Sequence, residues 1–331
     1  MSASCVENLL ISWCGIMDNE VDIEPGDSPR VALLLVLSVS MVSSASILIR
    51  FSESPPLVIV FWRTLLGAVL MASIGLLRGD YTLKAREAVG ANWKWFVAIG
   101  LFLCLHFSAW FTSLFLTTVA ASVVLTDSSP IFTALLSTFV LKEELGRKSW
   151  SGILLAVAGA VFLAWSDLIS SGYGALGGDL LALLSALFLA LYFIGGRKFA
   201  QGIPITVYTS VVYITASGFT LILCFVQGIN VIVLDQTELL LFLALAIFPT
   251  VLGHSVNNYL LTLVPAYVVS AAVLGEPVGA TLLAAVFLNE IPLPITFVGF
   301  VVILVGIALV LADLAGPGRK DISALDNAHG S

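Results

Sequence analysis

Two acidic residues lie where acids are rare, near the middle of long apolar segments. These residues are Asp127 and Glu276, and no end of a predicted helix lies close to either. An ionised carboxylate at the centre of a bilayer costs on the order of 3 kcal/mol or more unless it is paired, hydrated or protonated. Their type and depth therefore indicate a site for a proton or a cation. A structural hydrogen bond to a neighbouring helix is the alternative, and Glu276 would then satisfy backbone groups freed by Pro277.

His106 lies near the middle of the apolar segment that precedes the one containing Asp127. Counting about 1.5 Å per residue from opposite ends of the two segments places both side chains at a similar depth. A His–Asp contact is one interpretation, because histidine titrates in the range that a proton-coupled protein uses. A neutral histidine bonded to one hydroxyl or carbonyl group is the other. Trp110, at position i+4, would form a cavity wall beside His106.

Four further polar side chains interrupt apolar segments. His254, Asn257 and Asn258 form a stripe at positions i, i+3 and i+4. Polar groups of a membrane helix face the bundle interior, because lipid offers them no partner. The stripe predicts a substrate-binding surface, with interhelical hydrogen bonding as the alternative. Arg63 lies about two turns into another segment, where it could reach outward to water, pair with an acid or hold a substrate carboxylate.

The elements that hold these residues are long and apolar. The chain is 59% hydrophobic and only 11% charged, with a mean hydropathy of +1.07. A soluble domain cannot cover that much apolar surface, and the bilayer core needs about 20 apolar residues per helix, so the length allows about ten spans. The sequence predicts an all-α polytopic membrane protein with ten transmembrane helices. The predicted spans are Val31–Phe51, Pro56–Leu77, Trp95–Thr117, Val119–Leu141, Trp150–Trp165, Leu180–Gly196, Pro204–Val226, Leu239–Leu261, Ala266–Leu288 and Ile295–Ala312.

The segment Pro130–Gly159 recurs 147 residues later as Pro277–Gly306. The matching positions include a proline, a glutamate and two glycines in one register. A duplicated membrane unit is typical of transporters, and five spans per unit make the second copy enter the membrane from the opposite side. The repeats are therefore predicted to be inverted, and their glycines to allow close helix packing. The paired residues are Glu143 with Glu290, Gly152 with Gly299, and Gly159 with Gly306.

The distribution of basic residues predicts the orientation. With a cytoplasmic N-terminus, twelve lysines and arginines fall on the inside and only Arg50 and Arg63 lie toward the outside, as the positive-inside rule requires. We therefore expect a multi-pass protein of the cell membrane with both termini in the cytoplasm. The predicted parts are an acidic tail (1–30), a first repeat (31–166), a linker (167–178), a second repeat (179–313) and a C-terminal tail (314–331).

These features resemble the drug/metabolite transporter superfamily, and specifically proteins with two EamA domains. The resemblance covers about residues 31–313 and implies a secondary carrier of ten helices. In such a carrier helices 1–4 and 6–9 surround a central cavity, and helices 5 and 10 are peripheral. Typical cargoes are amino acids, other small metabolites or drugs, often exported. Besides the repeat glycines, the resemblance rests on Phe61-Trp62-Arg63, Ser129-Pro130-Ile131-Phe132, Lys142-Glu143-Glu144-Leu145, Gly275-Glu276-Pro277-Val278 and Leu288-Asn289-Glu290.

Signatures of several other functions are absent from the sequence. There is no Gly-x-x-x-x-Gly-Lys-Ser/Thr loop for ATP, no His-Glu-x-x-His or Cys-x-x-Cys motif for a metal, and no Gly-x-Ser-x-Gly elbow. We therefore expect no catalytic residues, no cofactor, no metal and no nucleic-acid partner. The expected partners are a small-molecule substrate and the lipid bilayer, and a homodimer stays open.

The leading hypothesis is a secondary active transporter that moves amino acids or related small metabolites by alternating access, in the direction of export. A proton-coupled exporter of cationic drugs is the alternative, because buried acids would suit a cation. A membrane-embedded enzyme and a non-transporting scaffold rank lower. An enzyme would need a catalytic constellation that the sequence does not supply, and a scaffold would not need acids inside its membrane segments.

Overall fold

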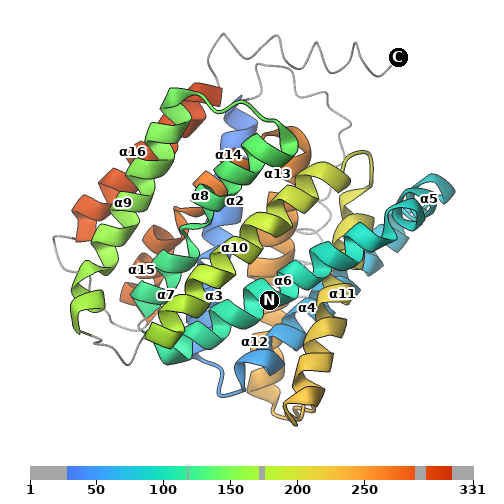
Figure 1. Ribbon diagram of the computed structural model, residues 1–331. Helices are drawn as coiled ribbons and strands as arrows, with labels where there is room; N and C mark the ends of the chain where they lie inside the picture. Colours follow the sequence, from blue (N-terminus) through green and yellow to red (C-terminus); the bar gives the residue numbers. More distant parts are fainter. Residues whose placement is uncertain (1–27, 118, 171–175, 288–295, 315–331) are drawn as a thin grey trace, which may run out of the picture.

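The computed structural model describes residues 28–117, 119–170, 176–287 and 296–314. Every regular element in these ranges is a helix, which confirms the predicted all-α fold (Figure 1). Most of the predicted tails, part of the predicted linker and Glu290 lie outside these ranges. The first half contains α2 (Ser28–Val42), α3 (Ser44–Arg50), α4 (Pro56–Arg78), α5 (Leu83–Ala91), α6 (Trp93–Leu116), α7 (Val119–Thr126), α8 (Ser129–Leu136), the π-helix η1 (Ser137–Leu141) and α9 (Arg147–Ser170). The second half contains α10 (Leu176–Phe199), α11 (Ile205–Val226), α12 (Gln236–Leu245), the π-helix η3 (Ala246–His254), α13 (Ser255–Leu263), α14 (Ala266–Val273), α15 (Glu276–Phe287) and α16 (Thr296–Leu314).

Eight helical stretches within the described ranges are long and apolar enough to cross a membrane, so the chain is a polytopic membrane protein. Two predicted spans are not among them. Val119–Leu141 is divided among α7, α8 and η1, and Trp150–Trp165 lies within the 24-residue α9. The count of ten therefore stays a prediction. The eight stretches are Pro29–Arg50, Pro56–Arg78, Trp93–Leu116, Leu176–Phe199, Ile205–Val226, Gln236–Leu263, Ala266–Phe287 and Phe297–Leu314.

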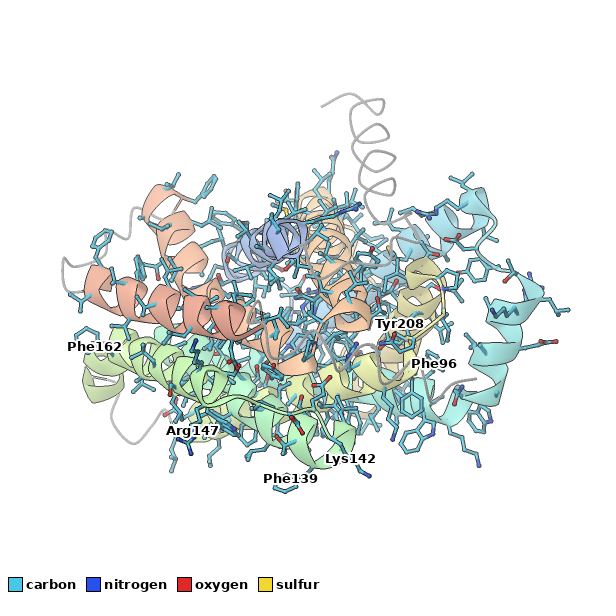
Figure 2. All side chains as sticks on the ribbon, turned by 90° about the horizontal axis from the view of Figure 1, so that it is seen from above. Phe96, Phe139, Lys142, Arg147, Phe162 and Tyr208 are labelled. Atoms are coloured by element: carbon cyan, nitrogen blue, oxygen red, sulfur yellow. The ribbon has the colours of Figure 1, made fainter. Side chains whose placement is uncertain are left out.

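The side chains are distributed as expected for a bundle surrounded by lipid. Large apolar side chains are exposed, among them Phe139, which is 77% exposed, and Phe162. Figure 2 shows both directed away from the bundle. Polar side chains are instead buried between helices, including Tyr208, which lies inside the bundle in the same view (Figure 2). The interior of the bundle therefore contains polar side chains as well as apolar ones.

The two halves of the chain pack against each other symmetrically. The main contacts that the elements of one half make with the other half have counterparts made by the corresponding elements of that other half. The first span of each half packs against the third and fourth spans of the other half: α10 packs on α6 and α8, and α2 packs on η3 and α15. The second spans, α4 and α11, pack on each other, and so do the fifth spans, α9 and α16. Figure 1 shows α9 and α16 side by side at the edge of the bundle. The other spans surround a shared centre.

Two spans are interrupted at positions 147 residues apart. A turn at Asp127–Ser128 separates α7 from α8, and a turn at Leu274–Gly275 separates α14 from α15. Each following helix has a proline in its first turn, where the missing N–H leaves no helical bond unmade. The expectation that no helix end lies near the two acids is therefore wrong. Asp127 lies in the first break, and Glu276 is the first residue of α15.

The repeat glycines lie on the two fifth spans. A Cβ atom added at Gly152 of α9 would lie 2.6 Å from the backbone oxygen of Gly306 in α16. One added at Gly159 would lie 3.0 Å from Ile303, and Gly299 is also buried. The helices α9 and α16 approach so closely because no side chain separates their backbones at these positions.

Candidate functional site

A small cavity lies beside the two helix breaks, at the centre of the bundle. Its volume is about 10 Å³, which is room for about one water molecule. Side chains from both halves of the chain form its walls. Six of the eight predicted binding residues line it: His106, Trp110, Asp127, His254, Asn257 and Glu276. Arg63 and Asn258 lie behind the walls.

Both predicted acids are buried at this cavity. Asp127 is 2% exposed and Glu276 is 4% exposed. Asp127 Oδ2 and Glu276 Oε1 have no hydrogen-bond partner among the described residues. Glu276 also begins α15, and the free N–H groups of a helix N-terminus favour negative charge. Each carboxyl group thus keeps an oxygen atom that can bind a proton, a cation or a hydrogen-bond donor.

His106 is held by α10 and not by Asp127. Its Nδ1 atom lies 2.8 Å from the hydroxyl oxygen of Ser185 and 3.1 Å from the carbonyl oxygen of the same residue. In the described ranges no hydrogen bond joins His106 to Asp127, although both line the cavity. Trp110 stacks on His106 with ring centroids 6.1 Å apart, and its Nε1 atom lacks a partner there. The two rings form one wall of the cavity.

The polar stripe is divided between the cavity and a helix contact. His254 and Asn257 line the cavity, where His254 Nδ1 and Asn257 Nδ2 have no partner in the part of the chain described. The Oδ1 atom of Asn257 accepts a 2.7 Å hydrogen bond from Ser38 of α2. Asn258 instead donates to the hydroxyl group of Tyr192 on α10. The stripe therefore contributes two residues to the cavity and one to a contact between helices.

The π-helix η3 positions His254 at the end of its wide turns. Pro249 lies inside η3 and has no N–H group to donate. Thr250 follows it, and its hydroxyl group donates to the carbonyl oxygen of Leu245 at 2.8 Å. π-Helical turns within longer helices are frequent at functional sites.

Arg63 is wholly buried, at 0% exposure. Its Nε atom donates to Thr250 Oγ1 at 3.0 Å, and its guanidinium carbon lies 4.1 Å from the centre of the Phe107 ring. Both Nη atoms lack a hydrogen-bond partner among the described residues. The sequence leaves three arrangements open for Arg63. Among the described residues, Arg63 neither reaches water nor pairs with an acid, so binding of a substrate carboxylate is the arrangement that stays open.

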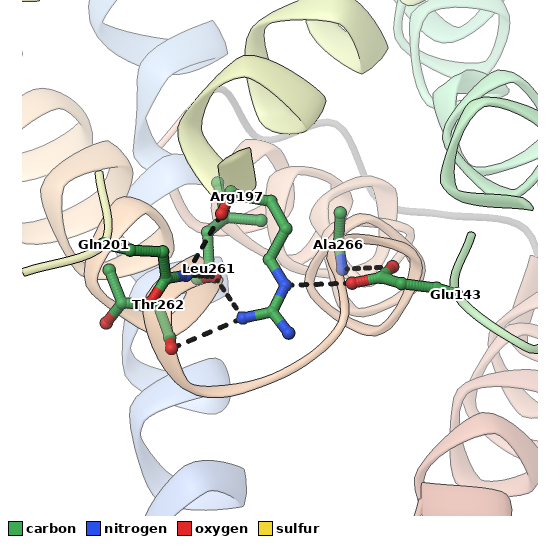
Figure 3. Close-up of polar contacts among 6 residues, drawn as sticks. All are labelled: Glu143, Arg197, Gln201, Leu261, Thr262 and Ala266. Carbon is green, nitrogen blue, oxygen red and sulfur yellow. Dashed lines mark hydrogen bonds and ion pairs between the residues drawn. The ribbon is translucent and has the colours of Figure 1, made fainter. Parts of the chain in front are cut away.

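A second polar cluster, the end clamp, joins α10, α13 and α14 to the loop between η1 and α9 at one end of the bundle. Arg197, near the end of α10, pairs with Glu143 Oε1 at 2.9 Å. Its Nη1 atom donates to the carbonyl oxygens of Leu261 and Thr262 in α13, at 3.0 and 3.4 Å. Glu143 Oε2 accepts from the backbone N–H of Ala266, where α14 begins, at 3.3 Å. Figure 3 shows the guanidinium group between the carboxylate and the two carbonyl groups.

Sequence reasoning missed the hydroxyl groups that complete the site. Thr126 lines the cavity, while Ser185 and Ser38 hold His106 and Asn257. Serine and threonine are common in membrane helices, where they bond to their own backbone or to a neighbouring helix. No spacing or composition therefore distinguished these three. Within the described ranges, no group of three His, Cys, Asp or Glu side chains could hold a metal ion.

Two regions of the chain, residues 29–165 and 176–312, match the EamA-like transporter family. The two matches begin 147 residues apart, which is the offset of the internal repeat. Both halves of the chain are thus copies of one family domain, and the predicted resemblance is confirmed.

The chain is 31% identical over 196 residues to a Salmonella typhimurium protein named "Probable amino-acid metabolite efflux pump", across 56% of this chain and 65% of that protein. It is 23% identical over 311 residues to the "Uncharacterized transporter YxxF" of Bacillus subtilis, across 94% and 98% of the two chains. The chain thus spans slightly less than two thirds of the Salmonella protein. A solved structure described as "Crystal structure of protein" has a TM-score of 0.71 and 20% identity, across 87% of this chain and 99% of that one. At that identity the likeness extends to the fold alone.

Proposed function

Because the chain belongs to the EamA-like transporter family, we propose that it is a secondary active transporter that exports amino acids or related small metabolites through the central cavity. The observation that carries this proposal is the group of buried polar atoms at the cavity without partners in the described ranges. Each such atom costs about 1–3 kcal/mol, so a site that retains several is suited to a polar ligand. The name of the Salmonella relative supports amino-acid metabolites as cargo.

The size of the cavity supports a closed conformation within the proposed transport cycle. About 10 Å³ is far below the several hundred Å³ of small-molecule sites, so cargo needs the cavity to open. The interlocking halves supply two groups that can move: α10 with α6 and α8, and α2 with η3 and α15. Rocking of one group against the other would open the cavity to each side of the membrane in turn.

A proton-coupled exporter of cationic drugs is the second candidate. Asp127 and Glu276 favour it, because two buried carboxyl groups at one cavity attract a cation. Arg63 favours the first candidate, because its buried guanidinium group has no acidic partner among the described residues and would repel a cation.

Flux in proteoliposomes containing the full-length protein tests both candidates. We expect protein-dependent movement of labelled amino acids, at a rate that changes when a pH gradient is imposed. Movement of cationic dyes without movement of amino acids would favour the drug exporter. Failure of both cargo classes to move, in vesicles where the protein is folded, would contradict the transport proposal.

A further inference from the structure

The centre of the bundle holds a guanidinium group and two carboxyl groups, and each keeps hydrogen-bonding atoms without partners among the described residues. Arg63 offers Nη1 and Nη2, Asp127 offers Oδ2 and Glu276 offers Oε1, all without partners in the described part of the chain. Nε of Arg63 bonds to Thr250, so within the described ranges Arg63 forms no hydrogen bond with either acid. Resting on the proposed transport function, we infer that the site recognises a zwitterionic head group, with Arg63 binding its carboxylate and the two acids binding its ammonium.

Arg63 is held in the geometry that a carboxylate needs. Thr250 accepts the hydrogen bond of Nε, and the rings of Phe107 and Phe111 lie 4.1 and 5.4 Å from the guanidinium carbon. These contacts fix the plane of the side chain and leave both Nη atoms free. Two parallel N–H groups bind a carboxylate through two charge-assisted hydrogen bonds. A buried guanidinium without an anion is unfavourable, because it has left water without gaining a partner of opposite charge.

Phe107 connects Arg63 to the wall of the cavity. The centre of its ring lies 5.0 Å from that of His254 and 5.0 Å from that of His106, and both histidines line the cavity. Phe107 therefore contacts both the guanidinium group and these two cavity residues. Displacement of this one ring as the cavity opens would give cargo access to Arg63.

The two acids are the groups at the cavity that can bind the ammonium end. An ammonium group has three N–H donors, and two of them can be accepted by Asp127 Oδ2 and Glu276 Oε1, which have no partners in the described ranges. A simple organic cation would leave Arg63 unpaired, and a simple carboxylate would leave both acids unpaired. A zwitterion satisfies both ends at once, so the chemical class of the cargo is an amino acid with a free carboxylate and a free amino group.

The first test asks which charged ends the transport requires. Proteoliposomes with the full-length protein would transport labelled phenylalanine or leucine in competition with unlabelled derivatives. For phenylalanine the derivatives are its methyl ester and phenethylamine, which lack the carboxylate, and N-acetylphenylalanine, which lacks the ammonium. We expect each derivative to compete at least about tenfold more weakly than phenylalanine, because a charged contact is lost. Equal competition by any of the three would overturn the assignment of that end.

The second test assigns the carboxylate to Arg63. Arg63→Gln should raise the KM for the amino acid at least about tenfold while leaving inhibition by phenethylamine unchanged, because only the amino acid uses the guanidinium group. Arg63→Lys keeps the charge without the two parallel donors and should give an intermediate KM. Arg86→Gln removes an exposed arginine of α5 and should have no effect. Equal weakening of amino acid and amine in both Arg63 variants would make the residue structural and overturn the inference.

The two proposals fail in different ways. If amino acids are transported but the methyl ester, phenethylamine and N-acetylphenylalanine compete as well as phenylalanine, only the zwitterion site is contradicted. Absence of flux for every compound contradicts the transport function itself, and with it the site.

Discussion

Individual residues of the site differ in how completely the fold satisfies them. His106 and Asn258 have partners on α10, in the Ser185 hydroxyl and the Tyr192 hydroxyl. Asp127, Asn257 and Asn258 each keep one side-chain atom without a partner in the described ranges, but only Asp127 and Asn257 line the cavity. Because a buried polar atom without a partner costs about 1–3 kcal/mol, Asp127 and Asn257 are better placed for contact with a ligand. Substitutions should separate the two kinds of residue.

Asp127→Asn is predicted to abolish or uncouple flux while the protein stays folded. The amide keeps the size and hydrogen bonding of the side chain, but it cannot release a proton or neutralise a cation. Flux should be measured in proteoliposomes at several pH values, beside Glu87→Gln, which changes an exposed acid of α5. Normal, pH-dependent flux in Asp127→Asn would show that the carboxyl group is structural.

Asn257→Ala and Asn258→Ala are predicted to have different effects, although the two residues are adjacent. Asn257 lines the cavity, so its loss should raise the KM several-fold, as expected for a hydrogen bond worth about 1 kcal/mol. Asn258 bonds to Tyr192, so its loss should leave the KM unchanged and lower stability by about 0.6 kcal/mol, the average for such bonds between membrane helices. Each variant serves as the control for the other in flux and thermal unfolding measurements. A raised KM in Asn258→Ala with an unchanged KM in Asn257→Ala would place the cavity on the other face of α13.

At the scale of helices, two contacts have opposite characters. The contact of α9 with α16 is close and built on glycine, so no side chain can move to relieve a change there. The end clamp is polar, and its ion pair keeps side-chain exposures of 26% and 13%. We expect the first contact to be rigid and the second to break and re-form.

Gly306→Val is predicted to destabilise the protein by about 1–3 kcal/mol, the usual cost of overpacking. Its Cβ atom would lie 2.6 Å from the backbone oxygen of Gly152 and from the backbone nitrogen of Ala156, and neither atom belongs to a flexible side chain. Gly218→Val in α11 is the matched control, because a Cβ atom there meets nothing within 4 Å. Thermal unfolding in detergent measures both. Equal midpoints for the two variants would contradict close packing of α9 on α16.

Glu143→Gln is predicted to loosen the end clamp. The substitution removes the ion pair with Arg197, which for a partly exposed pair is worth up to about 1 kcal/mol. A cysteine replacing the buried Val264, between the bonded carbonyl groups and Ala266, should then react several-fold faster with a maleimide. Glu144→Gln alters the exposed neighbouring acid and should leave the rate unchanged. Equal rates in both backgrounds would show that the clamp does not control access.

Composition and periodicity predicted most of the elements, because bilayer-length apolar runs leave a strong signal. They did not predict the breaks inside the spans. The second break had a local signal, in Gly275 followed by Pro277. The first break had only one local signal, Pro130, three residues after Asp127. A hydropathy average over about 20 residues does not reveal a single turn within an apolar span. Helix α5 was missed because its nine residues are too few to span.

The candidate site was predictable where polarity alone identifies a residue. A carboxyl, imidazole or amide group inside an apolar span must face the bundle, and five such predictions meet at one cavity. Partners depend on how helices rotate about their axes, which the sequence does not encode locally. His106 therefore bonds to Ser185 although its depth matches that of Asp127. The wide turns of η3 set the direction of Asn257, and no periodicity signals them.

For the whole molecule, the exchange symmetry of the packing is the feature that connects fold and function. The first span of each half lies against the opposite half, so neither half can form the cavity walls alone. His106 and Asp127 come from the first family domain, and His254 and Glu276 come from the second. Both domains are therefore needed for the site to exist.

The topology of the whole chain is predicted to place both termini in the cytoplasm and residue Gly172 outside. An odd number of spans separates Gly172 from either terminus in the inverted arrangement, and the basic residues favour this orientation. Reporter fusions at Gly172 and at Gly316 should give opposite signals for cytoplasmic and external location. The same signal from both fusions would contradict the inverted repeat.

The two helix breaks fall at corresponding places in the repeats, but the residues there do not correspond in chemistry. Asp127 aligns with Leu274, and Glu276 aligns with Ser129. In an inverted repeat the halves exchange roles when the carrier turns from one side of the membrane to the other. Two identical halves would make the inward-facing and outward-facing forms equal in free energy, and each would be half populated. With the acids on unmatched positions that degeneracy is lifted, so under the proposed transport cycle we expect the two forms of the unloaded protein to differ in population even when no gradient acts on them.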